Sequence, residues 1–287
     1  MTPLSLHSDE FRLIADAFGD EVANGDDAAV LDGHQLIATD TILEGVHFLF
    51  EDDAAAIGHK AVAVNLSDLA AMAGRPTVIT IGLTIGRRWN ATRLRELLGA
   101  IQATAHRYGA AVVGGDTTSW DGPLAICVTV LGTATRPIGR DGGRCGDTLY
   151  VSGPLGRSYE TKHHLTFEPR LELAERLSLS GTFELHAMID LSDGLSSDLH
   201  HLCAASGCGA VLIGRAVPLR EAEPGGHPVT LDDALTDGED FELLVAAGGE
   251  WAGPELTAIG TLCEGDVLIE RDGRRQPLPA AGFSHSV

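Results

Sequence analysis

Apolar and polar residues recur along this chain with two different periods, and the changes of period predict where helices and strands lie. A spacing of three to four residues predicts helices over residues 9–18, 54–74, 91–108, 170–179 and 195–205. Runs of branched apolar residues between turn residues predict strands at 27–31, 35–39, 77–85, 110–113, 124–133, 148–152, 210–213, 241–246, 256–261 and 267–271. Between the first two strands, Asp32-Gly33 is typical of a hairpin turn.

Helices and strands alternate, which predicts an α+β fold of the α/β type. A glycine-rich segment, residues 142–147, is the best candidate for a linker between two domains. We therefore expect an N-terminal domain over residues 1–140 and a C-terminal α/β domain over residues 141–287. Residues 158–167 have no clear period.

Two helices carry leucine and alanine patterns that predict their buried faces. On the helix at 91–108, the inward positions are expected to be Leu94, Leu97, Leu98 and Ile101. The helix at 54–74 is alanine-rich, and its Lys60, Val64, Ser67 and Asp68 can share one face. That face is either an exposed polar stripe or part of a largely buried helix. The apolar neighbours favour the buried alternative.

The most distinctive stretch is residues 190–198, Asp-Leu-Ser-Asp-Gly-Leu-Ser-Ser-Asp, between an apolar run and a predicted helix. Acids at a helix N-terminus often cap the backbone N–H groups. Two acids flanking Leu-Ser also fit a hard cation, because Mg²⁺ prefers oxygen ligands. The stretch alone leaves capping and metal binding equally open.

Related acidic segments occur elsewhere in the chain. The phrase returns as Asn65-Leu66-Ser67-Asp68-Leu69, and acids also cluster at 25–27, 39–41 and 114–118. We expect Asp27 and Asp40 at strand ends, and Asp116 just beyond a short strand at a sheet edge. Carboxylates gathered in one cleft need a counter-charge, and the chain has only two lysines, Lys60 and Lys162. Divalent metal is therefore the expected counter-charge.

Composition narrows the class of protein. The formal net charge is −21, from 41 acidic residues against 20 Lys and Arg, which argues against binding to nucleic acid or to an anionic membrane. Nucleotides remain possible ligands where metal ions bridge the anions. The five cysteines form no CxxC pair, which favours a reducing cytoplasm without disulfides or a zinc knuckle. Residues 1–10 lack a basic region followed by an apolar stretch, and no apolar run reaches about 18 residues, so neither a signal peptide nor a membrane span is expected.

Known phosphate-binding motifs such as GxxxxGK[ST] are missing, so nucleotide binding would depend on acids, metals and glycine-rich backbone. His47 follows the acidic segment at 39–41 and is either structural or functional. Arg140 could hold phosphate oxygens or lie on the surface. Residues 237–241 could be an ordinary turn.

Six segments together resemble thiamine-monophosphate kinases, in the superfamily that includes aminoimidazole ribonucleotide synthetase and selenophosphate synthetase. They are GDDAAVL at 25–31, TDTILEGVHF at 39–48, HKAVAVNLSDLAAMAG at 59–74, GGDTTS at 114–119, IDLSDGLSSDL at 189–199 and DGEDFELL at 237–244. They occur in the family's order, and together they span about four-fifths of the chain.

The resemblance implies a fold, a reaction and a site. It implies an N-terminal domain for ATP binding, metal binding and dimerisation, whose sheet pairs with that of a second subunit into a barrel-like core. The implied reaction moves the γ-phosphoryl group of ATP onto thiamine monophosphate, with no general base required. The residues that would hold several Mg²⁺ ions are Asp27, Thr39, Asp40, Asp68, Asp116, Asp190 and Asp193. ATP would contact Gly115, Asp116, Arg140 and Ser192, and the thiamine phosphate would face His47 and Glu239.

Three positions depart from the family pattern. Ala38 stands where a serine is common, the segment after Gly156 is shorter by roughly two dozen residues, and Ala280 occupies the place of an aromatic residue, with Phe283 nearby. Two alternatives to the kinase therefore stay open. The chain could act on another small phosphorylated acceptor, or it could bind nucleotide or thiamine phosphate without turnover.

Overall fold

The computed structural model describes residues 25–283, so the helix predicted over residues 9–18 lies outside the described part. The chain forms two compact units. The five-stranded unit comprises residues 27–137 and 162–175, and the seven-stranded unit comprises, within the described part, residues 25–26, 138–161 and 176–283. No helix among the described residues is long and apolar enough to cross a membrane.

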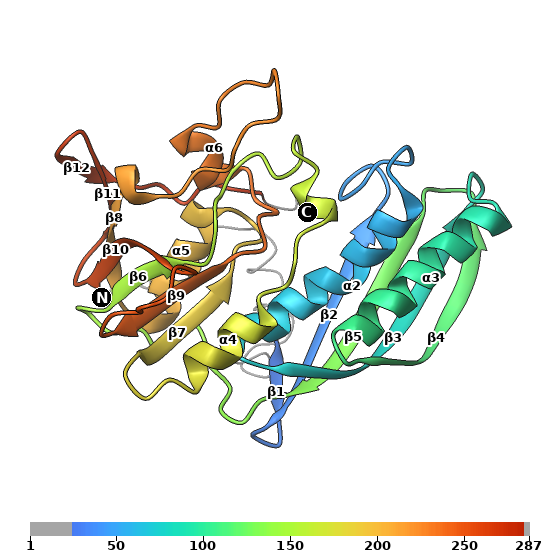
Figure 1. Cartoon of the computed structure of the whole chain (residues 1–287), viewed down its shortest axis with the longest axis horizontal. Coiled ribbons are helices and arrows are strands. Elements are labelled where there is room, and N and C mark those ends of the chain that lie inside the picture. The colour runs from blue at the N-terminus through green and yellow to red at the C-terminus, as the bar shows by residue number, and fades with distance from the viewer. Residues whose placement is uncertain (1–24, 284–287) are drawn as a thin grey trace, which may run out of the picture. The chain divides into compact units, whose positions relative to one another are not determined.

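The five-stranded unit is a sheet with two long helices on one face (Figure 1). Its strand order is β1-β2-β5-β3-β4, where only β3 and β4 are parallel. The strands are β1 (Ala29–Leu31), β2 (Gln35–Leu43), β3 (Arg75–Gly86), β4 (Ala111–Trp120) and β5 (Ala125–Thr133). The helices are α2 (Ala54–Ala71), against β2 and β5, and α3 (Ala91–Arg107), which packs on α2.

The predicted hairpin is confirmed, because β1 and β2 pair antiparallel with Leu31 opposite Gln35. β2 is nonetheless longer than predicted, since it runs on to Leu43. Asp40 therefore lies in the middle of a strand, opposite Val128 of β5, and the expectation that it ends a strand is wrong. The reason is that Thr41, Ile42 and Leu43 continue the β-prone pattern, and the pairing with β5 extends over them.

β4 is also longer than predicted. The expected strand stopped at Val113, but β4 continues through the two glycines and Asp116 to Trp120, paired with β3. Gly115 permits this close pairing, because a Cβ there would lie 2.1 Å from the carbonyl oxygen of Ile81. A glycine pair that resembles a turn in the sequence is here part of a strand.

Helix α2 is buried on nearly all sides, which rules out the exposed polar stripe. Lys60 and Ser67 are buried and Asp68 is half-buried. The Lys60 ammonium donates to the carbonyl oxygen of His47 at 2.7 Å, which offsets part of the cost of burying its charge. On α3, Leu97 and Ile101 are buried as predicted, but Leu98 is exposed.

The seven-stranded unit has the strand order β12-β11-β8-β10-β6-β9-β7. The strands are β6 (Thr148–Val151), β7 (Glu184–Asp190), β8 (Gly209–Ile213), β9 (Leu243–Gly248), β10 (Thr257–Cys263), β11 (Val267–Arg271) and β12 (Arg274–Pro277). Helix α5 (Leu195–Ser206) packs on β7, β8 and β9 and contacts the short helix α6 (Leu231–Thr236). Sequence patterns did not predict β7, α6 or β12, because these are short or follow irregular segments.

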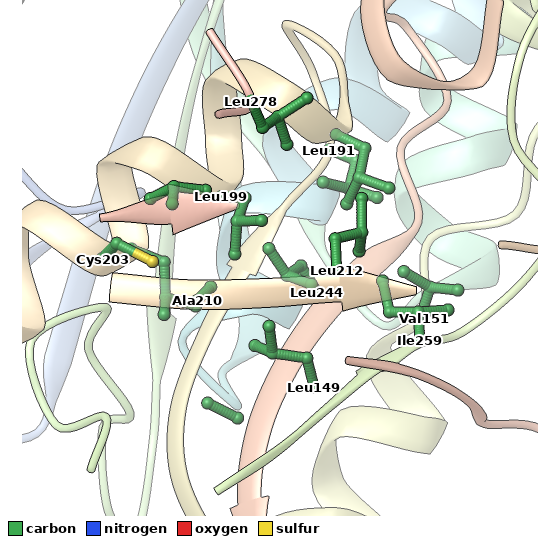
Figure 2. Packing of buried hydrophobic residues seen from close by; sticks show 14 of the residues in the cluster. Leu149, Val151, Leu191, Leu199, Cys203, Ala210, Leu212, Leu244, Ile259 and Leu278 are labelled. Atoms are coloured by element: carbon green, nitrogen blue, oxygen red, sulfur yellow. The ribbon is translucent and has the colours of Figure 1, made fainter. Parts of the chain in front are cut away.

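The core of this unit is aliphatic, and it lies between α5 and the sheet (Figure 2). Leu191, Leu195, Leu199 and Leu202 on the α5 side meet Leu149, Leu212, Leu244 and Ile259 from the strands. Because Leu191 and Leu195 flank the Ser-Asp-Gly turn, burying them fixes that turn against the sheet.

Residues 162–175 have no strand of their own, and they dock onto the helices of the five-stranded unit. The Phe167 carbonyl lies 2.8 Å from Nε2 of His59 on α2, and Glu168 pairs with Arg107 at the end of α3. Lys162 donates to Asp52 at 2.9 Å. The segment includes the short 3₁₀ turn η2 (His163–Leu165), and helix α4 (Leu171–Ser178) begins in it.

We predict different costs for two adjacent leucines on α3. Leu97→Ala should lower the free energy of unfolding by about 2–5 kcal/mol, because it leaves a cavity in the interface with α2. Leu98→Ala should change it by less than about 1 kcal/mol, because that side chain is 41% exposed. Urea unfolding followed by circular dichroism measures both, and equal costs would contradict this packing.

Candidate functional site

The turn between β7 and α5, Leu191–Gly194, is held by backbone hydrogen bonds from two distant segments. Leu191 donates to the Glu242 carbonyl at 2.8 Å and accepts from Phe241 at 2.8 Å. The carbonyl of Ser192 accepts from Glu239 at 2.7 Å, and that of Asp193 accepts from Phe283 at 3.0 Å. Fixed on several sides, the turn places Asp190, Ser192 and Asp193 in defined positions.

The start of α5 shows which acid binds its backbone N–H groups. The N-cap residue of α5 is Gly194, which has a φ of +115° and no side chain to cap with. The carboxylate of Asp198 instead reaches back and accepts from the N–H groups of Asp193 and Gly194, at 3.2 and 3.1 Å. Asp198, the last acid of the stretch, is therefore the one that binds the backbone N–H groups at the helix start, and metal binding by Asp190 and Asp193 stays a prediction.

Asp193, Asp198 and His201 form a compact group whose potential ligand atoms all lie within 4.8 Å of one another. His201 follows Asp198 by three residues on α5, so the two side chains share one helical face. Burial, with the positive charges of Arg140 and His200, lowers the pKa of His201 to about 4. The imidazole is therefore neutral at pH 7, and Arg140 lies close enough to act on this group.

Arg140 is anchored rather than loose on the surface. Its side chain is 11% exposed, and its Nε and backbone N–H both lie 3.3 Å from carboxylate oxygens of Asp26. A buried arginine beside an acidic group is suited to phosphate oxygens, because its guanidinium offers several donors in one plane.

The turn at 237–241 is more than ordinary turn chemistry. Glu239 and Phe241 both have positive φ, +57° and +50°, which is uncommon for residues other than glycine. Asp240 holds the turn through hydrogen bonds from Gly156 and an ion pair with Arg220 at 2.7 Å. Burial raises the pKa of Asp240 to about 6 despite that arginine. The result is a turn that presents Glu239 beside Ser192.

In the five-stranded unit, Asp27 and Asp68 come together. A carboxylate oxygen of Asp27 lies within 4.8 Å of one of Asp68, although one residue precedes β1 and the other is on α2. Asp40 lies near this helix, since its backbone N–H donates to Asn65 on α2 at 3.2 Å. Thr39 bonds to β5 through Thr129 at 2.9 Å. The Asn-Leu-Ser-Asp helix therefore meets two of the predicted acidic segments.

Asp116 does not join this group within the sheet. It lies on edge strand β4 opposite Gly82 of β3, and β3 and β5 separate β4 from the strand of Asp40. Three steps of strand spacing correspond to roughly 14 Å. Gly115 lies beside it on the same strand. These two predicted residues are exposed on the sheet edge.

His47 lies in the turn after β2, close to α2. Its Nδ1 is 3.0 Å from the backbone N–H of Leu43, and its carbonyl accepts from buried Lys60. The bond from Leu43 requires Nδ1 to accept, so Nε2 of the neutral ring carries the proton. The structural and the functional interpretation of His47 are compatible, since one nitrogen fixes the ring and the other is a donor.

The C-terminal segment reaches the Ser-Asp-Gly turn as well. Ser196 donates to the Pro279 carbonyl at 2.6 Å, His200 Nε2 is 2.8 Å from the Leu278 carbonyl, and Phe283 binds Asp193 through its backbone. The Phe283 side chain is exposed. An aromatic residue therefore lies beside the turn, three positions after Ala280.

Sequence reasoning missed several residues that shape the site, chiefly Asp198 as the capping acid, His201, and the Arg220–Asp240 pair. The i, i+3 spacing of Asp198 and His201 was a usable signal. Arg220 lies in an irregular segment, and no pattern marked it.

The comparisons agree over nearly the whole chain. Residues 25–134 match the family model described as AIR synthase related protein, N-terminal domain. The thiamine-monophosphate kinase of Rhodopirellula baltica is 40% identical over 271 residues, with 88% of this chain and 83% of the relative covered. That of Salmonella typhimurium is 34% identical over 330 aligned positions, with 96% and 98% covered.

A solved structure gives the same result. "AaThiL complexed with AMPPCP and TMP" superposes with a TM-score of 0.85 at 28% identity, covering 96% of both chains. The alignment with the Salmonella relative is longer than this 287-residue chain, so this chain has gaps against it. With these similarities and the acidic segments in place, the chain belongs to the thiamine-monophosphate kinase family.

Proposed function

We propose that this protein is an ATP-dependent thiamine-monophosphate kinase, which transfers the γ-phosphoryl group of ATP to thiamine monophosphate to give thiamine diphosphate and ADP. The observation that carries the proposal is the 40% identity to a thiamine-monophosphate kinase over 88% of the chain. The match to a structure named with AMPPCP and TMP supports the same pair of substrates. The five free cysteines agree with a cytoplasmic location.

Mg²⁺ is proposed as the metal, and the donor set fits it. The acids proposed as ligands in the five-stranded unit are Asp27, Asp40, Asp68 and Asp116, with Thr39, and those in the seven-stranded unit are Asp190 and Asp193. Two carboxylates as close as Asp27 and Asp68 repel each other, so a cation between them would be favourable. Bound Mg²⁺ would neutralise phosphate charge and orient the phosphoryl group.

The other residues would bind and orient the two substrates. Arg140 would hold phosphate oxygens of ATP. Gly115, on the exposed strand β4, and Ser192, in the turn before α5, would contact the nucleotide through their backbone. His47 and Glu239 would face thiamine monophosphate, where the Nε2–H of His47 is a donor suited to a phosphate oxygen. The acceptor is itself a phosphate and already anionic, so no side chain has to remove a proton from it. The residues need only position two anions and reduce their repulsion.

A homodimer is proposed from the family's fold, with the five-stranded sheets of two chains forming a barrel-like core. Edge strand β4 supports it, because Val113 and Trp120 are 60% and 52% exposed. A long exposed edge strand presents unpaired backbone N–H and C=O groups with which a strand of another chain can pair.

For the dimer, light scattering should give about twice the chain mass of 30.1 kDa. Val113→Glu should shift the mass to that of one chain, because a charge would be buried on the pairing edge. Leu179→Glu, at a 67% exposed position of the seven-stranded unit, is the matched control and should remain dimeric. A monomeric native protein would refute this part of the proposal.

The reaction itself is tested with purified protein, ATP, Mg²⁺ and thiamine monophosphate, by measuring thiamine diphosphate and ADP. We expect both products in equal amounts. EDTA should stop their formation, because without metal ions nothing neutralises the repulsion between the acidic residues and the phosphates of the two substrates. ADP formation with a different phosphorylated acceptor alone would favour the second enzyme hypothesis. Tight ligand binding without ADP would favour the binding protein.

The metal ligands are tested by Asp68→Asn and Asp193→Asn. Each should lower kcat by roughly 100-fold or more while leaving the circular dichroism spectrum unchanged, because the amide keeps the shape but loses the charge that holds the metal. Asp121→Asn, at an exposed surface position, is the matched control and should keep full activity. Full activity in both site variants would refute the assignment.

A further inference from the structure

Four of the five cysteines gather in one region of the seven-stranded unit. Cys145 lies in the turn before β6, Cys203 is on α5, Cys208 precedes β8, and Cys263 ends β10. Cys263 is the register partner of Gly209, the residue after Cys208. The mechanism uses none of these thiols, and the fifth cysteine, Cys127, lies on β5 in the other unit.

Cys145 and Cys208 are in direct contact. Their Sγ atoms are 3.6 Å apart, although the residues are 63 positions apart in sequence. A disulfide bond is about 2.05 Å long, so the two sulfur atoms need to approach by only about 1.5 Å. Rotation of two short side chains and a small shift of an exposed turn supply a movement of that size.

The two thiols differ in their exposure to solvent and in their hydrogen bonds. Cys145 is exposed, whereas Cys208 is buried, with its Sγ 3.7 Å from the Gly143 carbonyl and 3.6 Å from that of Ser206. Burial, followed by the hydrogen bond with Cys145, raises the pKa of Cys208 to about 11. The exposed thiol is therefore the one that an oxidant reaches first.

The other two cysteines are less suited to this chemistry. Cys203 is packed in the aliphatic core with Leu199 and Ala210 (Figure 2), and burial raises its pKa to about 12. Cys263 is half-buried at the end of a paired strand. The contact between two sulfur atoms singles out Cys145 and Cys208.

We propose that Cys145 and Cys208 form a site of reversible oxidation, at which a peroxide converts the two thiols into an intramolecular disulfide. The Cys145 thiolate attacks one peroxide oxygen, the O–O bond breaks, and a sulfenic acid and hydroxide result. The Cys208 sulfur then attacks the sulfenic sulfur, and its proton leaves with the displaced hydroxide as water. Two thiols and one hydrogen peroxide give one disulfide and two waters, and a dithiol reverses the change.

The bond would fasten a turn that is already tied to the end of α5. Gly143 donates to the Ser206 hydroxyl at 2.9 Å, and this hydroxyl donates to the Arg140 carbonyl at 2.8 Å. The disulfide would add a covalent link beside these hydrogen bonds. Because it closes a long loop of the unfolded chain, we expect the oxidised protein to unfold at a higher temperature.

The test treats the reduced full-length protein with an equimolar amount of hydrogen peroxide, followed by alkylation in denaturant and mass spectrometry without reductant. The five free thiols should fall to three, with one cross-linked peptide pair that contains Cys145 and Cys208. Dithiothreitol should restore all five. The melting temperature should rise on oxidation and fall again on reduction.

Variants make the assignment specific. Cys145→Ser replaces an exposed residue and should not disturb folding. After peroxide treatment, none of its four remaining cysteines should be cross-linked, and its melting temperature should not rise. Cys127→Ser and Cys263→Ser are the matched controls and should still lose two thiols. A disulfide to Cys263, a disulfide between two chains, or over-oxidised Cys145 beside a free Cys208 thiol would each overturn the proposal.

Discussion

The backbone of the turn Leu191–Gly194 is the constraint on which the candidate site of the seven-stranded unit depends. Its N–H and carbonyl groups are paired with residues near 240, with Phe283 and with the Asp198 carboxylate. Because buried backbone polar groups must be paired, these hydrogen bonds fix the turn and its partner segments relative to each other. That pairing places the backbone of Asp193 and Glu239, and Asp190 is placed by its pairing with Leu243 of β9.

The many acidic residues of this chain repel one another, and this repulsion opposes folding. A net charge of −21 favours an expanded chain, and two lysines offer little local compensation. Lys60 donates to a carbonyl, and Lys162 pairs with Asp52, which supports the loop before α2. Because both lysines already have partners, the positive charges proposed to bind phosphates are the buried Arg140 and bound metal ions.

Sequence patterns predicted most helices and strands, because long periodic segments such as α2, α3 and β5 carry strong signals. They failed where tertiary pairing decided the result. β2 passes through Asp40 and β4 passes through Gly115 because neighbouring strands continue the ladder, which no local pattern reveals. Leu98 is exposed although it fits the helical period, whereas Leu97 and Ile101 on the same helix are buried.

The candidate site was predictable as a set of acidic motifs, but its supporting contacts were not. Asp27 and Asp68 are 41 residues apart, and only the fold brings them together. The ion pair of Arg220 with Asp240 and the backbone hydrogen bond from Phe283 to Asp193 join segments that are distant or irregular in sequence. Sequence motifs indicate which residue types can bind metal and phosphate, whereas the contacts between distant segments determine where those residues lie and which of them support the turn.

The segment after Gly156, which the family resemblance predicts to be shortened, is expected to bear on substrate choice more than on phosphoryl transfer. Gly156 itself is held by Asp240, so the start of the segment is tied to the turn that presents Glu239. Its continuation, residues 162–175, is fixed on α2 and α3 through Lys162, Phe167 and Glu168. None of the proposed metal ligands lies in this stretch, so the loss of residues there leaves them in place. A shorter segment would alter the chain near Glu239, the residue proposed to face the acceptor, so we expect the choice of acceptor to be the part of the reaction most sensitive to it.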